Sequence, residues 1–142
     1  MLNKDFLQQK CEYIAKDLEA LHPHRDKTFD EIAANPVLMP FVERMLEKIV
    51  TRGIDINRHI LSEIGDGTEK LLKNEDTFLA MGKHGVISEE LAKAIAPSAG
   101  LRNRLVHEYN DTDERIIFAS VGTALEQYPR YCEAVLIFIE KQ

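Results

Sequence analysis

Apolar residues recur at three- and four-residue steps along almost the whole chain, and this spacing predicts helices joined by short loops. The first such segment runs to about Leu21, where the His-Pro-His sequence at 22–24 ends it, because proline cannot continue a helix. The longest segment runs from about Val37 to Ile64. Gly53 lies inside it and allows a bend, since glycine costs about 1 kcal/mol in a helix interior. The period-two alternation of strands is missing from the sequence.

Polar residues at the expected helix starts supply capping signals. Thr28 and Glu31 form a capping box that opens a short helix, which stops before the Asn-Pro pair at 35–36. Asp111 and Glu114 form a second capping box, which opens the last helix at 112–141. The two ends of the chain are therefore expected to be helical.

Two shorter helices are expected between the long ones. Asp76 is the predicted N-cap of the first, which ends near Gly82 to Gly85. Ser88 is the predicted N-cap of the second, which Pro97 interrupts or restarts before it continues through residues 102–109.

Long helices with short connections predict an all-α protein, an antiparallel bundle of four to five main helices forming one domain over residues 1–142. Pro129 is expected to kink the last helix unless its ring is accommodated locally. This helix carries apolar residues, Ile117, Val121 and Leu125, beyond what one bundle core needs. We expect part of this surplus to form a homodimer interface, and a deeply buried core helix is the alternative.

Composition narrows the class of protein. The hydrophobic fraction of 44% and the charged fraction of 30% are typical of a soluble globular domain. The sequence has neither an apolar run of the roughly 20 residues that a membrane span needs nor an apolar signal-peptide core, so we expect a cytoplasmic protein. Cys11 and Cys132 are then expected to be reduced thiols, which lie close together if the terminal helices pack.

The charge of the chain restricts how it can bind RNA. A net charge of −6 is not the usual signature of a high-affinity nucleic-acid binder, so any RNA contact needs a local basic patch. Arg44, Lys48 and Arg52 form a basic stripe at i, i+4 and i+8 that can follow a phosphate backbone. Glu43 and Glu47 lie alongside, so a solvated face of mixed charge is the alternative.

The chemically active side chains gather in the octapeptide 102–109, Arg-Asn-Arg-Leu-Val-His-Glu-Tyr. Arginine can bind a phosphate, histidine can transfer a proton near neutral pH, and a phenol can accept a covalent group. Each helical residue turns about 100°, so Arg102 and His107 point about 140° apart on a straight helix. A site that uses both needs a wrapping arginine, a helix end near His107, or a second subunit. Asn103 lies four residues before His107 and shares its face.

The spacing within the octapeptide resembles the Arg-x(4–6)-His-x-Tyr signature of the HepT-like toxins, which are members of the HEPN superfamily of all-helical ribonucleases. Four residues separate Arg102 from His107, and one residue separates His107 from Tyr109. Pro97 before the motif and the long helix after it agree with that family. Such chains often carry tryptophan after the proline, where this chain has Ser98. The resemblance covers the whole chain in helix order and length, and its specific part is the octapeptide.

The resemblance implies metal-independent RNA cleavage in a cleft shared by two subunits, with no cofactor. His107 would exchange a proton with the ribose 2′-OH or the leaving oxygen, and Arg102 would clamp the scissile phosphate. Asn103 would orient His107 or bond a phosphate oxygen. The family also implies a nucleotidyltransferase antitoxin that transfers AMP from ATP to Tyr109, which adds negative charge and bulk beside the arginine.

The residues alone leave other functions open. His107 can be a helix C-cap, Arg102 a solvated side chain, Tyr109 a packing residue, and Arg104 with Glu108 a surface ion pair. A non-catalytic helical module that binds a nucleotide or a partner is the main alternative, and a structural subunit of a larger complex is another. Cleavage of RNA in EDTA to cyclic-phosphate ends separates the enzyme from both. His22 and His24 have too few nearby ligands for a convincing zinc site.

Overall fold

The computed structural model describes residues 1–101 and 111–142, with the side chains of the last helix described from residue 114 onward. The main helices are α1 (Lys4–Leu21), α2 (Phe29–Ala33), α3 (Leu38–Ile64), α4 (Asn74–Lys83), α5 (Glu89–Ile95) and α7 (Asp111–Glu140). Two 3₁₀ turns, η1 (His22–His24) and η2 (Thr68–Leu71), lie in the connections. Neither described range contains a strand, and the all-α prediction is confirmed.

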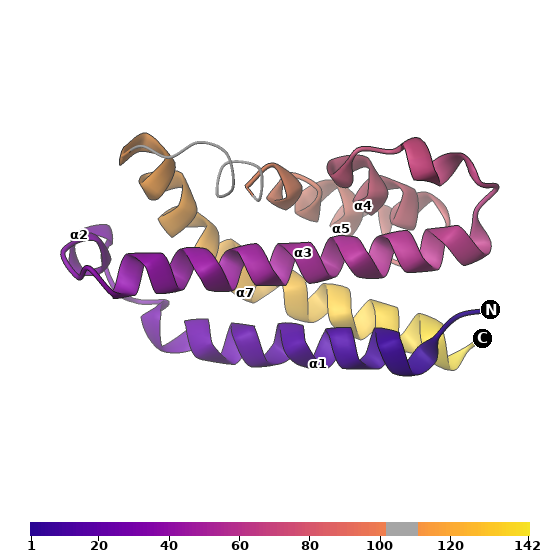
Figure 1. Ribbon diagram of the computed structural model, residues 1–142, viewed down its shortest axis with the longest axis horizontal. Coiled ribbons are helices and arrows are strands. Elements are labelled where there is room, and N and C mark those ends of the chain that lie inside the picture. Colours follow the sequence, from indigo (N-terminus) through magenta and orange to yellow (C-terminus); the bar gives the residue numbers. More distant parts are fainter. Residues whose placement is uncertain (102–110) are drawn as a thin grey trace.

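Three long helices form the body of the molecule (Figure 1). α1 packs against both α3 and α7, while α4 and α5 pack on each other and contact α3 and α7 respectively. The chain ends meet at one end of the bundle, where the Lys4 ammonium donates to the Gln142 carbonyl oxygen at 3.0 Å. The core is built from the apolar faces of these helices. The apolar residues recur every three to four positions, so they lie on one face of each helix and meet in the centre of the bundle.

Two of the predicted caps are present. The amide of Glu31 donates to the Thr28 hydroxyl at 3.2 Å and the amide of Thr28 donates to the Glu31 carboxylate at 3.1 Å, which completes the capping box. The Ser88 hydroxyl accepts from the amide of Leu91 at 3.1 Å. Residues 96–97 break the helix after α5 and residues 98–101 are helical again, as Pro97 predicts.

The predicted N-cap at Asp76 is wrong. α4 begins at Asn74, and Lys73 holds the N-cap position without a side-chain hydrogen bond. The Asn74 side chain accepts from the Arg58 guanidinium at 2.8 Å, a contact between helices that the local sequence pattern does not contain. Asp76 lies in the first turn, where its carboxylate still interacts favourably with the helix dipole.

The last helix is mainly a core element. α7 begins at Asp111 and continues through Pro129. The predicted capping box of this helix involves side chains outside the described residues. Ile117 and Val121 are buried inside the subunit, so the core alternative is right for them and they cannot supply a dimer interface. Leu125 is partly buried, and the exposed large apolar residues of this helix are Ile116, Leu136 and Ile137.

No helix formed by residues 1–101 or 111–142 is long and apolar enough to cross a membrane.

Candidate functional site

The octapeptide, with Arg102, Asn103, His107 and Tyr109, lies outside the described residues. The structure describes the segments on either side of it. Residues 98–101 lead into the octapeptide from α5, and α7 follows it from Asp111. The predicted roles of the four side chains therefore stay predictions, while the surroundings of the segment can be examined directly.

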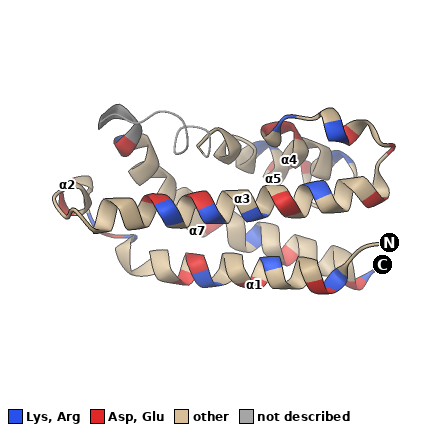
Figure 2. Ribbon diagram, viewed as in Figure 1, with Lys and Arg blue, Asp and Glu red and all other residues tan. Residues whose placement is uncertain are grey.

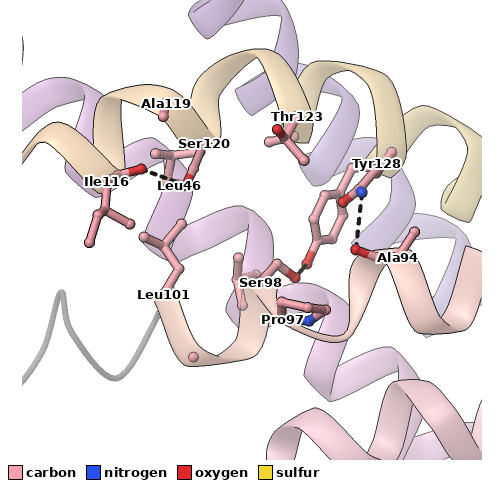
Figure 3. A pocket seen from close by; sticks show the side chains of 14 residues that line it. Leu46, Ala94, Pro97, Ser98, Leu101, Ile116, Ala119, Ser120, Thr123 and Tyr128 are labelled. Carbon is pink, nitrogen blue, oxygen red and sulfur yellow. Dashed lines mark hydrogen bonds between the residues drawn. The ribbon is translucent and has the colours of Figure 1, made fainter. Parts of the chain in front are cut away.

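A cavity of about 450 Å³ lies between the segment at 94–101 and the first half of α7, with α3 behind it (Figure 3). Apolar side chains form most of its wall, and hydroxyl and amide groups interrupt it. The lining residues are Leu46, Val50, Ala94, Pro97, Ser98, Gly100, Leu101, Ile116, Ala119, Ser120, Thr123, Ala124, Gln127 and Tyr128. We call this space the motif-side cavity, because Leu101 is the chain neighbour of Arg102.

Two hydrogen bonds tie the wall of the cavity together. The hydroxyls of Ser98 and Tyr128 share a hydrogen bond of 2.7 Å. The Gln127 amide nitrogen donates to the Ala94 carbonyl oxygen at 3.1 Å. Both bonds join α7 to the segment that leads into the octapeptide, so they hold this segment in place against α7.

A buried aromatic cluster of Phe78, Tyr128 and Tyr131 packs behind this wall, on the side of the protein core. The ring of Phe78 lies 6.5 Å from that of Tyr128 and 5.7 Å from that of Tyr131, with the edge-to-face geometry that aromatic pairs prefer. The Tyr131 hydroxyl lies 3.0 Å from the Gly53 carbonyl oxygen and contacts the Asn57 side chain as well. Burial raises the pKa of Tyr128 and of Tyr131, so both phenols stay neutral.

Gly53 has a different role from the bend that its sequence position allowed. α3 continues through it, and a Cβ there would lie 3.1 Å from Cε1 of Tyr128 and 3.3 Å from Cζ of Phe78. Glycine lets the helix backbone approach the aromatic cluster. The cluster is not evident from the aliphatic pattern of α7, but Tyr128 and Tyr131 continue the spacing of its buried face, which is the signal that could have identified them.

The basic stripe is largely engaged in ion pairs within the bundle. The Lys48 ammonium lies 3.2 Å from the carboxylate of Asp17 on α1, and the Arg52 guanidinium binds the other oxygen of the same carboxylate. Arg44 pairs with Glu47 at 3.4 Å. Figure 2 shows acidic and basic residues mixed along α3. These contacts favour the alternative of a face with mixed charge over a phosphate-binding stripe.

The pairing of Asp17 gives a testable effect on stability. Replacing Asp17 by asparagine leaves two cations without their partner at a side chain that is 9% exposed, and we expect the free energy of unfolding to fall by about 1–3 kcal/mol. Asp55→Asn is the matched control, because its pair with Lys10 is more exposed and is worth about 0–1 kcal/mol. Urea denaturation of both variants measures the difference, and equal losses would contradict this role of Asp17.

The two cysteines meet where α1 packs on α7. Both are buried and free. Interaction with the neighbouring Cys132 thiol lowers the pKa of Cys11, and the same interaction together with burial raises the pKa of Cys132. The expected proximity of the two thiols is confirmed.

Groups of at least three histidine, cysteine or acidic side chains that could hold a metal do not occur among the described residues. His24 packs edge-on against Phe41, with ring centroids 5.9 Å apart. Desolvation lowers the pKa of His24, so its imidazole is neutral at pH 7.

Solved structures of toxin–antitoxin complexes share this arrangement of helices. One is the tri-AMPylated HEPN toxin of Shewanella oneidensis in complex with an MNT antitoxin, which is 20% identical with a TM-score of 0.75 over 92% of this chain and 96% of that one. Another is a toxin–antitoxin complex with AMP-PNP, which is 19% identical with a TM-score of 0.76 over 92% and 97% of the two chains. The fold is therefore that of the HEPN toxins.

Sequence comparison identifies the family within that fold. The family described as ribonuclease HepT-like matches residues 10–135. A tRNA nuclease HepT of Aphanizomenon flos-aquae is 38% identical over 139 residues, which cover 96% of this chain and 93% of that protein. The chain belongs to the HepT-like ribonuclease family, and the family resemblance inferred from the sequence is confirmed.

Proposed function

We propose that this chain is the toxin of a toxin–antitoxin pair, and that it cleaves transfer RNA without a metal ion. The observation that carries the proposal is that a HepT-like chain, 38% identical to a tRNA nuclease, keeps arginine, histidine and tyrosine at the family spacing in residues 102–109. The purified chain, incubated with tRNA in EDTA, is expected to yield 2′,3′-cyclic-phosphate and 5′-hydroxyl ends. Intact tRNA under these conditions would contradict the proposal.

His107 acts as the general base and general acid of the proposed reaction. As the ribose 2′-oxygen bonds to phosphorus and the 5′-oxygen leaves, one imidazole accepts the 2′-hydroxyl proton and another protonates the leaving oxygen. An unperturbed imidazole pKa near 6.5 suits both tasks at neutral pH. Two imidazoles are available if two copies of the chain form one cleft, where His107 of one copy is the base and the second copy's equivalent is the acid.

Arg102 binds the scissile phosphate and stabilises the negative charge that grows on its oxygens. Asn103 orients His107 or donates to a phosphate oxygen. The dimer also removes the difficulty that Arg102 and His107 point about 140° apart on a straight helix, because each phosphate can then contact side chains from two copies.

A nucleotidyltransferase antitoxin is the proposed regulator. Both structural relatives are complexes of a toxin with an antitoxin, and one toxin is tri-AMPylated. We place the modification of this chain on Tyr109. The transfer of one AMP forms a bond from the phenol oxygen to the α-phosphorus of ATP and breaks the bond between the α-phosphorus and the oxygen that bridges it to the β-phosphorus. Pyrophosphate and the phenol proton are released. The added phosphodiester charge repels RNA from the neighbouring arginines.

Replacing Tyr109 by phenylalanine is expected to abolish AMP addition by the antitoxin, because the acceptor oxygen is gone. The measurement is intact-mass spectrometry after incubation with the antitoxin and ATP. Tyr13→Phe, on the exposed face of α1, is the matched control and should be modified like the parent. A mass increase from AMP on Tyr109→Phe would exclude this residue as the acceptor.

A further inference from the structure

We propose that the motif-side cavity binds one unpaired nucleobase of the RNA substrate, next to the phosphodiester that is cut. The inference rests on the proposed ribonuclease function and adds a base-binding subsite to it. This subsite consists only of described residues.

The size and the wall of the cavity suit a flat, largely apolar group. Its volume of about 450 Å³ lies within the range of roughly 300–1,000 Å³ that is usual for small-molecule sites. Leu101, Ile116 and Ala119 supply apolar surface for the faces of a ring, and the buried Leu46 and Val50 lie behind them. Figure 3 shows Leu101 on the segment before the octapeptide and Ile116 on α7, both at the edge of the cavity nearest to the octapeptide.

The charge of the lining selects a base over a phosphate. None of the 14 lining residues carries a formal charge, and burial keeps the Tyr128 phenol neutral. A phosphate moved into this space would lose water and gain no cation, which is unfavourable. A nucleobase loses little hydration from its faces when it enters such a space. We therefore place the neutral base of a nucleotide in the cavity and its phosphate beside the arginines of the octapeptide.

Two polar groups of the wall are available to bond the edge of a base. Within the described part of the chain, the Thr123 hydroxyl and the Gln127 amide oxygen have no hydrogen-bond partner, whereas the Gln127 amide nitrogen is held by Ala94. Thr123 and Gln127 are four residues apart on α7, so they lie on the same face of the helix. A fixed amide with a free oxygen and a nearby hydroxyl can accept from and donate to a base.

The position of the cavity connects it with the proposed cleavage. Leu101 precedes Arg102 directly, and Ile116 lies on the first turns of the helix that follows the octapeptide. Proteins that recognise RNA by sequence usually bind unpaired bases that are splayed out of a stack. A base held here would fix the position of the adjoining phosphodiester relative to Arg102.

The test combines a filled cavity with an RNA that lacks one base. In Ala119→Leu, a larger side chain grows from an exposed wall position, and Ala15→Leu on α1 is the matched control. The cleavage site of a tRNA is first mapped with protein that carries no AMP, as intact-mass spectrometry verifies. Abasic nucleotides are then placed one at a time around the site, and kcat/KM is measured for each protein with each RNA.

For the parent and Ala15→Leu, we expect one abasic position to lower kcat/KM by about 10-fold or more, as loss of a bound base should. With intact RNA, Ala119→Leu should have a kcat/KM that is lower than that of the parent by a similar factor. The abasic nucleotide at the sensitive position should then lower the kcat/KM of Ala119→Leu by less than about threefold further. If the two losses multiply, or if no position is sensitive, the subsite is refuted while the ribonuclease function stands.

A binding measurement keeps the two proposals separate. Oligonucleotides with 2-aminopurine in place of single bases are titrated with His107→Ala, and the fluorescence should change at the position that enters the cavity. Adding Ala119→Leu to this protein should remove that change. If the signal appears but the parent cuts no RNA, the subsite is supported and the ribonuclease function fails. Thr123→Val, which keeps the shape, replaces Ala119→Leu if circular dichroism shows that the leucine variant is unfolded.

Discussion

His107→Ala and Arg102→Ala are each expected to abolish growth arrest and to lower tRNA cleavage by roughly 10²- to 10⁴-fold. The histidine variant loses the group that moves protons, and the arginine variant loses the cation that stabilises the phosphorane-like charge. Growth of cells that express each variant and single-turnover cleavage by the purified proteins measure the effect. Both variants keep every residue of the described core, so circular dichroism is expected to show the helical content of the parent.

Two surface substitutions serve as matched controls. His84→Ala removes an imidazole that lies 3.7 Å from the Glu69 carboxylate, and Arg130→Ala removes an exposed guanidinium of α7. Both controls should stay toxic and cleave RNA within about threefold of the parent, since surface changes of this kind have small effects. A protein with both His107 and Arg102 replaced that remains as toxic as the parent would refute the site assignment.

Phe78→Ala is expected to lower the free energy of unfolding by about 3–5 kcal/mol, the largest effect on stability that we predict. Its side chain is fully buried and contacts the rings of Tyr128 and Tyr131 below the motif-side cavity. Its loss leaves a cavity between α3, α4 and α7 that these helices cannot close without moving. Guanidinium denaturation followed by circular dichroism measures the change.

Leu71→Ala is the control for that experiment, because Leu71 is 88% exposed and its truncation should cost no more than about 0.5 kcal/mol. Tyr131→Phe gives an intermediate case. It keeps the ring and leaves the side-chain oxygen of Asn57 without the phenol, which should cost about 1–3 kcal/mol. A loss below about 1 kcal/mol for Phe78→Ala would show that the cluster does not support this part of the fold.

Local patterns predicted the helices well. The spacing of apolar residues placed α1 and α3, and Thr28 and Ser88 marked helix starts that the hydrogen bonds confirm. These features succeeded because a helix and its cap depend on residues within a few positions of one another. The Asp76 cap failed because Asn74, two residues earlier, is held by Arg58 from another helix.

Surface and core assignments needed the packed molecule. The pattern of α7 fits Ile117 and Val121 either to a dimer interface or to the core, and both are buried inside the subunit. The spacing of Lys48 and Arg52 suits either a phosphate-binding stripe or a face of mixed charge, and both side chains bind Asp17. Asp17 lies on α1, which is distant from α3 in sequence, so a pattern on α3 alone cannot identify it.

The sequence by itself determined the all-helical class, the family and the residues proposed for chemistry, because each depends on the identity and spacing of nearby residues. The tertiary structure decided which basic residues are neutralised, why Gly53 must be small, and that an uncharged cavity adjoins the segment leading into the octapeptide. These properties arise where α3, α5 and α7 meet, and only packing determines which side chains of separate helices come within contact distance.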